Sequence, residues 1–209
     1  TYPVVVISIK ITKLFAKDKQ NKVTREELSA LSNLAYSEGV FSMQENRIIQ
    51  NIIDLKKIKA SEILTPRVVV FLADESLDLD SFSKEKNFSK HTRIPVFTNN
   101  IENVTGYVFL QDVIEKMSNK NNNLILKDLK RQILTVPNSV NVFSLFNQFL
   151  KKKEHIALIV DEYGGFDGII TMEDIIETLL GLEIIDENDQ VIDMQLYAKE
   201  KWYKKRDLG

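Results

Sequence analysis

Residues 156–181 read IALIVDEYGGFDGIITMEDIIETLLG, and this stretch predicts a strand, a turn, a second strand and a helix. The first five residues form a continuous apolar run of the length of a buried strand, and Gly164-Gly165 supplies the turn. From Met172 onwards the apolar residues recur at i, i+3, i+4, i+7 and i+8. This spacing is typical of an amphipathic helix, and Gly181 is expected to end it.

The junction between the second strand and the helix carries the candidate binding groups. Thr171 is expected at the N-cap of the helix and Asp174 at position N3. Free backbone N–H groups, a hydroxyl and a carboxylate then lie together where the helix dipole favours an anion. The residues alone leave a simpler interpretation open, a capping box in which both side chains only satisfy the start of the helix.

The same pattern recurs upstream at a constant offset of 62 residues. The segment 104–114 (VTGYVFLQDVI) matches 166–176 (FDGIITMEDII), and 93–97 (RIPVF) matches 155–159 (HIALI). An internal repeat of this kind indicates two copies of one unit, neither of which buries its sheet alone.

The two copies differ at one important position. Gly106 corresponds to Gly168 and Asp112 to Asp174, but Phe109 stands where the second copy has Thr171. The first copy thereby loses a hydroxyl and gains a ring, so we expect its site to be empty.

Composition excludes several classes of function. The chain has 209 residues, of which 44% are hydrophobic and 28% charged, as in globular proteins of one large or two small domains. It has no cysteine, which excludes disulfides and thiolate sites, and two histidines, His91 and His155, argue against a histidine metal centre. A net charge of -2 gives no bias toward nucleic acid. We find no nucleophile–base pair and no P-loop, and therefore expect no enzymatic activity.

The N-terminal part of the chain is interpreted as two regions. Residues 1–23 are interpreted as a juxtamembrane segment, mostly because of the family resemblance described below; the segment 2–15 is apolar, carries two lysines and is shorter than the about 20 residues that cross a bilayer. A strand or a core helix is the alternative. Residues 24–59 are predicted to form an acidic helical hairpin, with capping boxes at Thr24/Glu27 and Ser42/Glu45.

The remaining residues divide into the first repeat (60–118), a polar linker, the second repeat (124–182) and a C-terminal acidic linker and helix (183–209). Pro95 predicts that one side of the strand 93–97 lacks a ladder partner. The other predicted elements are a helical turn at 61–64, a buried strand at 68–72, a helix at 76–86, a strand at 104–109, a helix at 110–117, a strand at 133–136 and an amphipathic helix with Val142, Leu145, Phe146, Phe149 and Leu150.

Four motifs carry a family resemblance that covers nearly the whole chain. They are ILTPR at 63–67, HTRIPV at 91–96, DEYGG at 161–165 and TMED at 171–174. Together with the repeat they resemble a tandem pair of cystathionine-beta-synthase (CBS) domains, a Bateman module. More narrowly, they look like the cytosolic part of the CorC/HlyC and CNNM-type magnesium/cobalt transporters, which are haemolysin-like. The fold class so implied is α+β: two β-α-β-β-α repeats preceded by a helical hairpin. The CorC/HlyC carboxy-terminal domain of that family is not evident.

The resemblance implies an adenine-nucleotide site that takes ATP, with AMP or ADP as alternatives, and Mg²⁺ bound with the nucleotide. By this resemblance Thr171 contacts phosphate or ribose, Asp174 takes the ribose hydroxyls, Arg93 pairs with phosphate, and Thr65 and His91 border the adenine. Pro95 belongs to the same set, and no residue is assigned as a metal ligand. Three simpler roles stay open: Arg93 as a surface ion pair, His91 as a loop residue and Thr65 as a cap before Pro66.

The function so implied is a non-catalytic, nucleotide-sensing regulatory module of a membrane transporter for magnesium or other divalent cations. It would lie at the cytoplasmic face of the membrane, as a homodimer joined to its own N-terminal transmembrane domain, with no nucleic-acid partner. The alternative is a dimerisation or scaffold module whose nucleotide cleft is vestigial.

Overall fold

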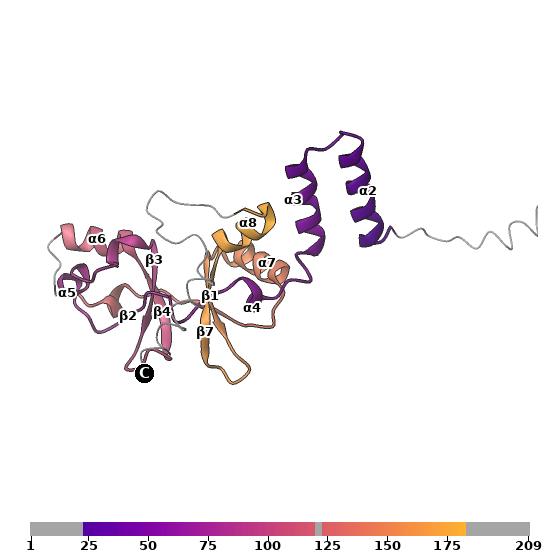
Figure 1. Ribbon diagram of the computed structural model, residues 1–209. Helices are drawn as coiled ribbons and strands as arrows, with labels where there is room; N and C mark the ends of the chain where they lie inside the picture. The colour runs from indigo at the N-terminus through magenta and orange to yellow at the C-terminus, as the bar shows by residue number, and fades with distance from the viewer. Residues whose placement is uncertain (1–22, 120–122, 183–209) are drawn as a thin grey trace, which may run out of the picture. The chain divides into compact units, whose positions relative to one another are not determined.

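The computed structural model describes residues 23–119 and 123–182 (Figure 1). The chain divides into two compact units, with the division between Ile49 and Gln50. Most of the expected juxtamembrane segment, part of the polar linker and the C-terminal tail 183–209 lie outside the described residues.

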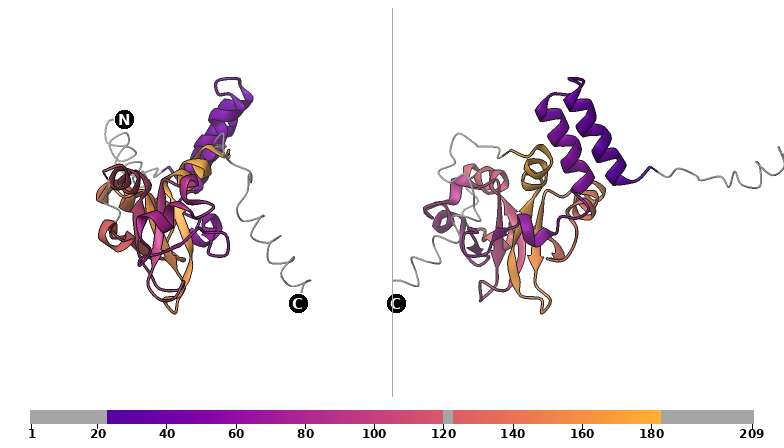
Figure 2. Two further views of the ribbon diagram at one scale, coloured as in Figure 1. Left: turned by 90° about the vertical axis from the view of Figure 1, so that its left-hand side faces the viewer. Right: turned by 45° about the vertical axis from the view of Figure 1, so that its right-hand side comes forward.

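The helical hairpin consists of α2 (Arg25–Ser37) and α3 (Met43–Asp54), which lie side by side in Figure 1 and in the right view of Figure 2. Both predicted capping boxes are confirmed. The backbone N–H of Thr24 donates to Glu27 at 3.0 Å and that of Ser42 donates to Glu45 at 2.7 Å, and each hydroxyl accepts the return bond. The helices are joined by a hydrogen bond of 2.5 Å from Ser32 Oγ to Asn46 Oδ1.

The apolar residues of the second hairpin helix, from which the sequence predicts its buried side (Ile48, Ile49, Ile52, Ile53 and Leu55), are covered to different degrees. Ile52 is 55% exposed, Ile48, Ile49 and Ile53 are half-buried, and Leu55, which follows α3, is 2% exposed. Ile52 lies roughly 120° around the helix from Asn46, the residue that contacts α2, so the hairpin does not cover it.

The first sheet has the strand order β2-β3-β4, formed by Ala73–Asp74, Arg93–Phe97 and Val104–Phe109. β2 pairs in parallel with β3, and β3 pairs antiparallel with β4. The helices of this half are α5 (Leu79–Ser83), η1 (Phe88–Lys90) and α6 (Leu110–Ser118). Its core consists of Ala73, Leu79, Phe82, Ile94, Val96, Val108, Val113 and Leu126.

The second sheet has the order β1-β7-β6-β5, formed by Thr65–Pro66, Phe166–Thr171, Ile156–Val160 and Leu134–Pro137. Its helices are α4 (Ala60–Ile63), α7 (Val142–Lys152) and α8 (Met172–Leu180), and η2 (Leu126–Leu129) precedes β5. Its core consists of Leu55, Ala60, Leu64, Leu134, Val136, Val142, Leu145, Phe149, Ala157, Ile159, Ile170 and Ile175. The mixed strand and helix content confirms the predicted α+β class.

The two repeats complete each other's sheets. Thr65, which precedes the first repeat's sheet in the chain, pairs with Ile169 of β7, and Arg131, which follows it, bridges Tyr107 of β4. These crossings explain the two glycines of the repeat motif. A Cβ at Gly168 would collide with the carbonyl oxygen of Thr65, and one at Gly106 with that of Arg131.

The faces of the two sheets that point away from the cores are buried as well. Tyr107, Ile156 and Leu158 are at most 6% exposed but belong to neither core, because side chains alternate along a strand. In Figure 1 the two sheets lie next to each other, with α5 and α6 beyond one and α7 and α8 beyond the other. Contacts between the two halves include a hydrogen bond of 3.4 Å from the hydroxyl of Tyr107 in β4 to Glu154, which precedes β6.

Three predictions need correction. Residues 68–72 are not a strand: Val69 N–H donates to Pro66 in a turn, Val68 is 49% exposed, and the strand β2 begins only at Ala73. The run has irregular backbone but still contributes to packing, since Phe71 lies against the first core.

The helix expected at 76–86 is shortened to α5, because Asp78 caps its start by accepting from Ser81 N–H. Leu150, placed on the apolar side of α7, is 57% exposed.

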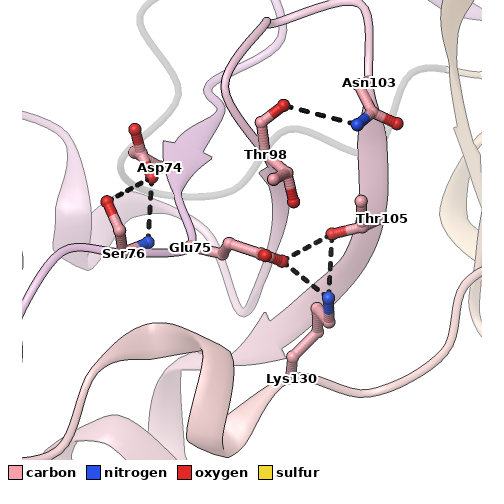
Figure 3. A network of polar contacts seen from close by, with 7 residues as sticks. All are labelled: Asp74, Glu75, Ser76, Thr98, Asn103, Thr105 and Lys130. Atoms are coloured by element: carbon pink, nitrogen blue, oxygen red, sulfur yellow. Dashed lines mark hydrogen bonds and ion pairs between the residues drawn. The ribbon is translucent and has the colours of Figure 1, made fainter.

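A buried ion pair connects Lys130, near the start of the second repeat, to Glu75 beside the first sheet (Figure 3). Glu75 is 5% exposed and accepts hydrogen bonds from Lys130 Nζ at 2.6 Å and Thr105 Oγ1 at 2.7 Å. The bonds from Lys130, Thr98 and Thr105 lower the pKa of Glu75 to about 2. Glu75 therefore stays ionised throughout the physiological pH range.

Candidate functional site

In the second repeat, strand β7 ends and helix α8 begins at the predicted strand–helix junction. Thr171 is the N-cap of α8, and Asp174 is at N3, as predicted. The backbone N–H and the hydroxyl of Thr171 donate to Asp174 Oδ2 at 2.5 and 2.7 Å, and Asp174 N–H donates back to the hydroxyl at 3.4 Å. The capping box is thus complete within the chain.

Thr65 joins this junction through the crossing of β1. It lies opposite Ile169, two residues before Thr171 on β7. Residues two apart on a strand share a face, so Thr65, Ile169 and Thr171 lie on the face opposite core residue Ile170. Three of the six predicted site residues, Thr65, Thr171 and Asp174, therefore meet at one end of the second sheet.

The corresponding junction of the first repeat is built differently. Phe109 is the N-cap of α6 and offers no side-chain capping bond. Arg93 lies opposite it on β3, and the guanidinium carbons of Arg93 and Arg131 lie 5.4 and 5.3 Å from the centre of the Phe109 ring. Arg131 also forms an ion pair of 2.5 Å with Asp112, the counterpart of Asp174, and this contact raises the pKa of Arg131.

Arg93 has no such carboxylate partner. Within residues 23–119 and 123–182 it forms no ion pair, so the surface ion pair considered from the sequence is not found there. Its guanidinium lies against the Phe109 ring and close enough to Tyr107 to act on the pKa of that phenol, which burial raises. A half-buried cation without a counter-charge in the described part of the chain is suited to an anionic ligand.

The other two predicted residues flank Arg93. Pro95 is buried in β3, and its only strand partner is Tyr107, because β2 pairs with Val96 and Phe97 alone. His91 precedes β3, and its ring stacks on Phe71 with centroids 6.1 Å apart. Arg93, Pro95 and His91 thus belong to the first sheet, and Thr65, Thr171 and Asp174 to the second.

Sequence reasoning missed Arg131. It lies outside the matched segments of the repeat, so no pattern pointed to it. A usable signal existed in the glycines: Gly106 and Gly168 correspond, and a backbone crossing at one of them implies a crossing at the other.

The described part of the chain contains neither a cluster of metal-ligating residues nor a membrane-spanning helix. No group of three or more histidine, aspartate or glutamate residues there is arranged to hold a metal ion. No helix within it has the length and apolar character needed to span a bilayer.

Comparison with known proteins shows which families the chain resembles. The CBS domain family matches residues 126–181. A UPF0053 protein of Synechocystis sp. is 34% identical over 200 residues, which are 95% of this chain and 58% of that protein. Haemolysin C of Brachyspira hyodysenteriae is 35% identical over 180 residues, which are 86% of this chain and 64% of that protein.

Solved structures give the same result. The CBS domain of the bacterial CNNM/CorC family Mg²⁺ transporter superposes with a TM-score of 0.74 at 27% identity, over 78% of this chain and 99% of that one. The structure of such a domain in complex with ATP gives a TM-score of 0.63 at 26% identity, over 66% and 99%. A CBS-domain pair with bound AMP from Klebsiella pneumoniae gives 0.54 at 25% identity, over 59% and 99%.

These matches identify a CBS domain at residues 126–181. More narrowly, the chain is similar to the haemolysin C and UPF0053 proteins and has the fold of the CNNM/CorC CBS domain, which confirms the resemblance drawn from its motifs. The chain spans about three fifths of the length of these two curated relatives.

Proposed function

We propose that this chain is an adenine-nucleotide-sensing, non-catalytic regulatory module of a membrane transporter for magnesium or another divalent cation. The observation that carries the proposal is the meeting of Thr65, Thr171 and Asp174 on one face at the start of α8. The structural relatives that contain ATP or AMP support adenine nucleotide as the ligand.

Each residue has a chemical role in this proposal. The Asp174 carboxylate accepts the two ribose hydroxyls, while Thr171 and the positive N-terminal end of the nine-residue helix α8 face phosphate. Arg93, which has no carboxylate partner among the described residues, pairs with phosphate, and Thr65 and His91 border the base. Mg²⁺ enters with the phosphates of the nucleotide.

The capping box supplies a sensing step. Asp174 Oδ2 accepts both donors of Thr171 in this structure, so a ribose that takes the carboxylate must share or replace these bonds. Ligand binding thereby acts on the first turn of α8. The signal passes to a transmembrane domain N-terminal to this chain, at the cytoplasmic face of the membrane, and the module works as a homodimer.

One observation favours a different function. Because the capping box is complete without a ligand, Thr171 and Asp174 can serve the helix start alone. The chain would then be a dimerisation or scaffold module with a vestigial site.

Calorimetric titration of the purified chain separates the two functions. ATP and MgATP are titrated in parallel, with GTP as a control for the base. The sensing function requires saturable heat for the adenine nucleotide. The absence of saturable heat at protein concentrations of tens of micromolar, with and without Mg²⁺, would support the scaffold.

A further inference from the structure

The two strand–helix junctions correspond residue by residue, and the correspondence includes the crossing segments. At the offset of 62 residues, Tyr107 corresponds to Ile169. Arg131 lies opposite Tyr107, and Thr65 lies opposite Ile169. Arg131 is therefore the structural counterpart of Thr65, although the two residues do not correspond in the sequence repeat.

This correspondence places an arginine where the second repeat has a threonine. The guanidinium of Arg131 reaches Asp112 at 2.5 Å and lies against the ring of Phe109 at 5.3 Å. In the second repeat the equivalent carboxylate, Asp174, accepts from its own N-cap, which Phe109 cannot do because it has no side-chain donor. Arg131 is thus the group that satisfies Asp112.

We infer that the first-repeat site is occupied by the chain itself, with Arg131 in place of an external ligand. The guanidinium donates an N–H, at 2.5 Å, to the carboxylate that would otherwise receive ribose hydroxyls. The aromatic ring and the cation together fill the space beside it. The inference rests on the proposed function only for the identity of the excluded ligand, the ribose of an adenine nucleotide.

The inference makes Arg131 and Phe109 the two residues that restrict each chain to one nucleotide. Exchanging both for the second repeat's residues, Phe109→Thr with Arg131→Thr, should release Asp112 and restore the threonine–aspartate pair.

The test is the binding stoichiometry of ATP by calorimetry. We expect one nucleotide per chain for the native protein and for Phe109→Thr alone, and two for the double variant. Adding Asp112→Ala to the double variant should return the value to one. A stoichiometry of one for a double variant that keeps its native far-ultraviolet dichroism would overturn the inference. A stoichiometry of two for Phe109→Thr alone would also overturn it, because Arg131 would then exclude nothing.

A second measurement does not depend on nucleotide binding. A double-mutant cycle of Arg131→Met and Asp112→Asn, followed by urea unfolding, measures the coupling between the two side chains. Because both are partly exposed, we expect a coupling of about two- to fivefold in the unfolding equilibrium constant. If the two side chains show no coupling, the inference is overturned, whether or not the native chain binds ATP. If they are coupled but the native chain binds no ATP, only the proposed nucleotide is refuted.

Discussion

Asn51, near the end of α3, donates a hydrogen bond of 3.1 Å from its side-chain amide to the backbone carbonyl oxygen of Leu179 in α8. The helix α8 therefore begins at the proposed ligand site, at Thr171 and Asp174, and near its end it contacts α3, the second helix of the hairpin, at Asn51. A change at the first turn of α8 has a short physical route to α3.

Breaking this contact should separate binding from signalling. In Asn51→Ala, ATP affinity should stay within about twofold of native, because Asn51 does not touch the site. Hydrogen exchange of residues 43–54 should then lose most of its response to ATP. Asn147→Ala is the matched control, because Asn147 donates to Phe143 of its own helix and to no other described residue. An ATP response of α3 that survives in Asn51→Ala would refute this route.

Arg93→Ala should weaken ATP more than adenosine, because the proposed contact is to phosphate. A charge-assisted hydrogen bond contributes about 1.5 to 3 kcal/mol, which is roughly ten- to a hundredfold in affinity. Calorimetry with both ligands measures the difference. Arg67→Ala is the control, since Arg67 is paired with Glu102 at 2.8 Å. Equal losses for ATP and adenosine would show that Arg93 supports the fold or the base.

Glu75 should make the protein sensitive to acid. Its pKa is about 2 in the folded state against an ordinary 4.5, so its contribution is complete above pH 4.5 and is lost as the pH falls toward 2. That contribution is about 3 kcal/mol. In Glu75→Gln, urea unfolding at pH 7 should show a loss of about this size and a flatter dependence between pH 5 and 3. Glu102→Gln, which removes an exposed ion pair, should change neither by more than about 1 kcal/mol.

The chain should sediment as a homodimer at tens of micromolar. The helices α6 and α8 expose Ile114 and Ile176 by 47% and 36%, and apolar helix faces favour a two-fold interface. Ile114→Asp with Ile176→Asp should give a monomer, whereas Leu150→Asp on α7 should not. A native chain that sediments only as a monomer, with and without ATP, would contradict the expectation.

Local patterns predicted most of the elements. The apolar runs and the period change gave β3, β4, β6 and α8 within about one residue, because each is set by residues adjacent in sequence. The run at 68–72 was wrongly predicted to be a strand, because a short apolar run on irregular backbone looks like a strand in the sequence when its contacts in space are unknown. The shortened α5 has the same origin, since the Asp78 cap is a local feature that the weak apolar pattern concealed.

The site was predictable only in part. Thr171 and Asp174 follow from a local cap, but the place of Thr65 beside them depends on a pairing across about 100 residues of chain. The ion pair of Arg131 with Asp112 depends on a similar crossing and on a residue outside the repeat. Neither pairing produces a periodic pattern in the sequence. Only Gly106 and Gly168 indicate the two backbone crossings, and they do so indirectly.

The most direct test of the account compares the two equivalent aspartates by ATP calorimetry. Asp174→Ala should cost about 2 kcal/mol, roughly thirtyfold in affinity, because it removes the acceptor for the ribose. Asp112→Ala should leave affinity nearly unchanged, with one nucleotide bound per chain in the native protein. Equal losses for the two variants, or two nucleotides per native chain, would contradict the assignment of the site to the second repeat.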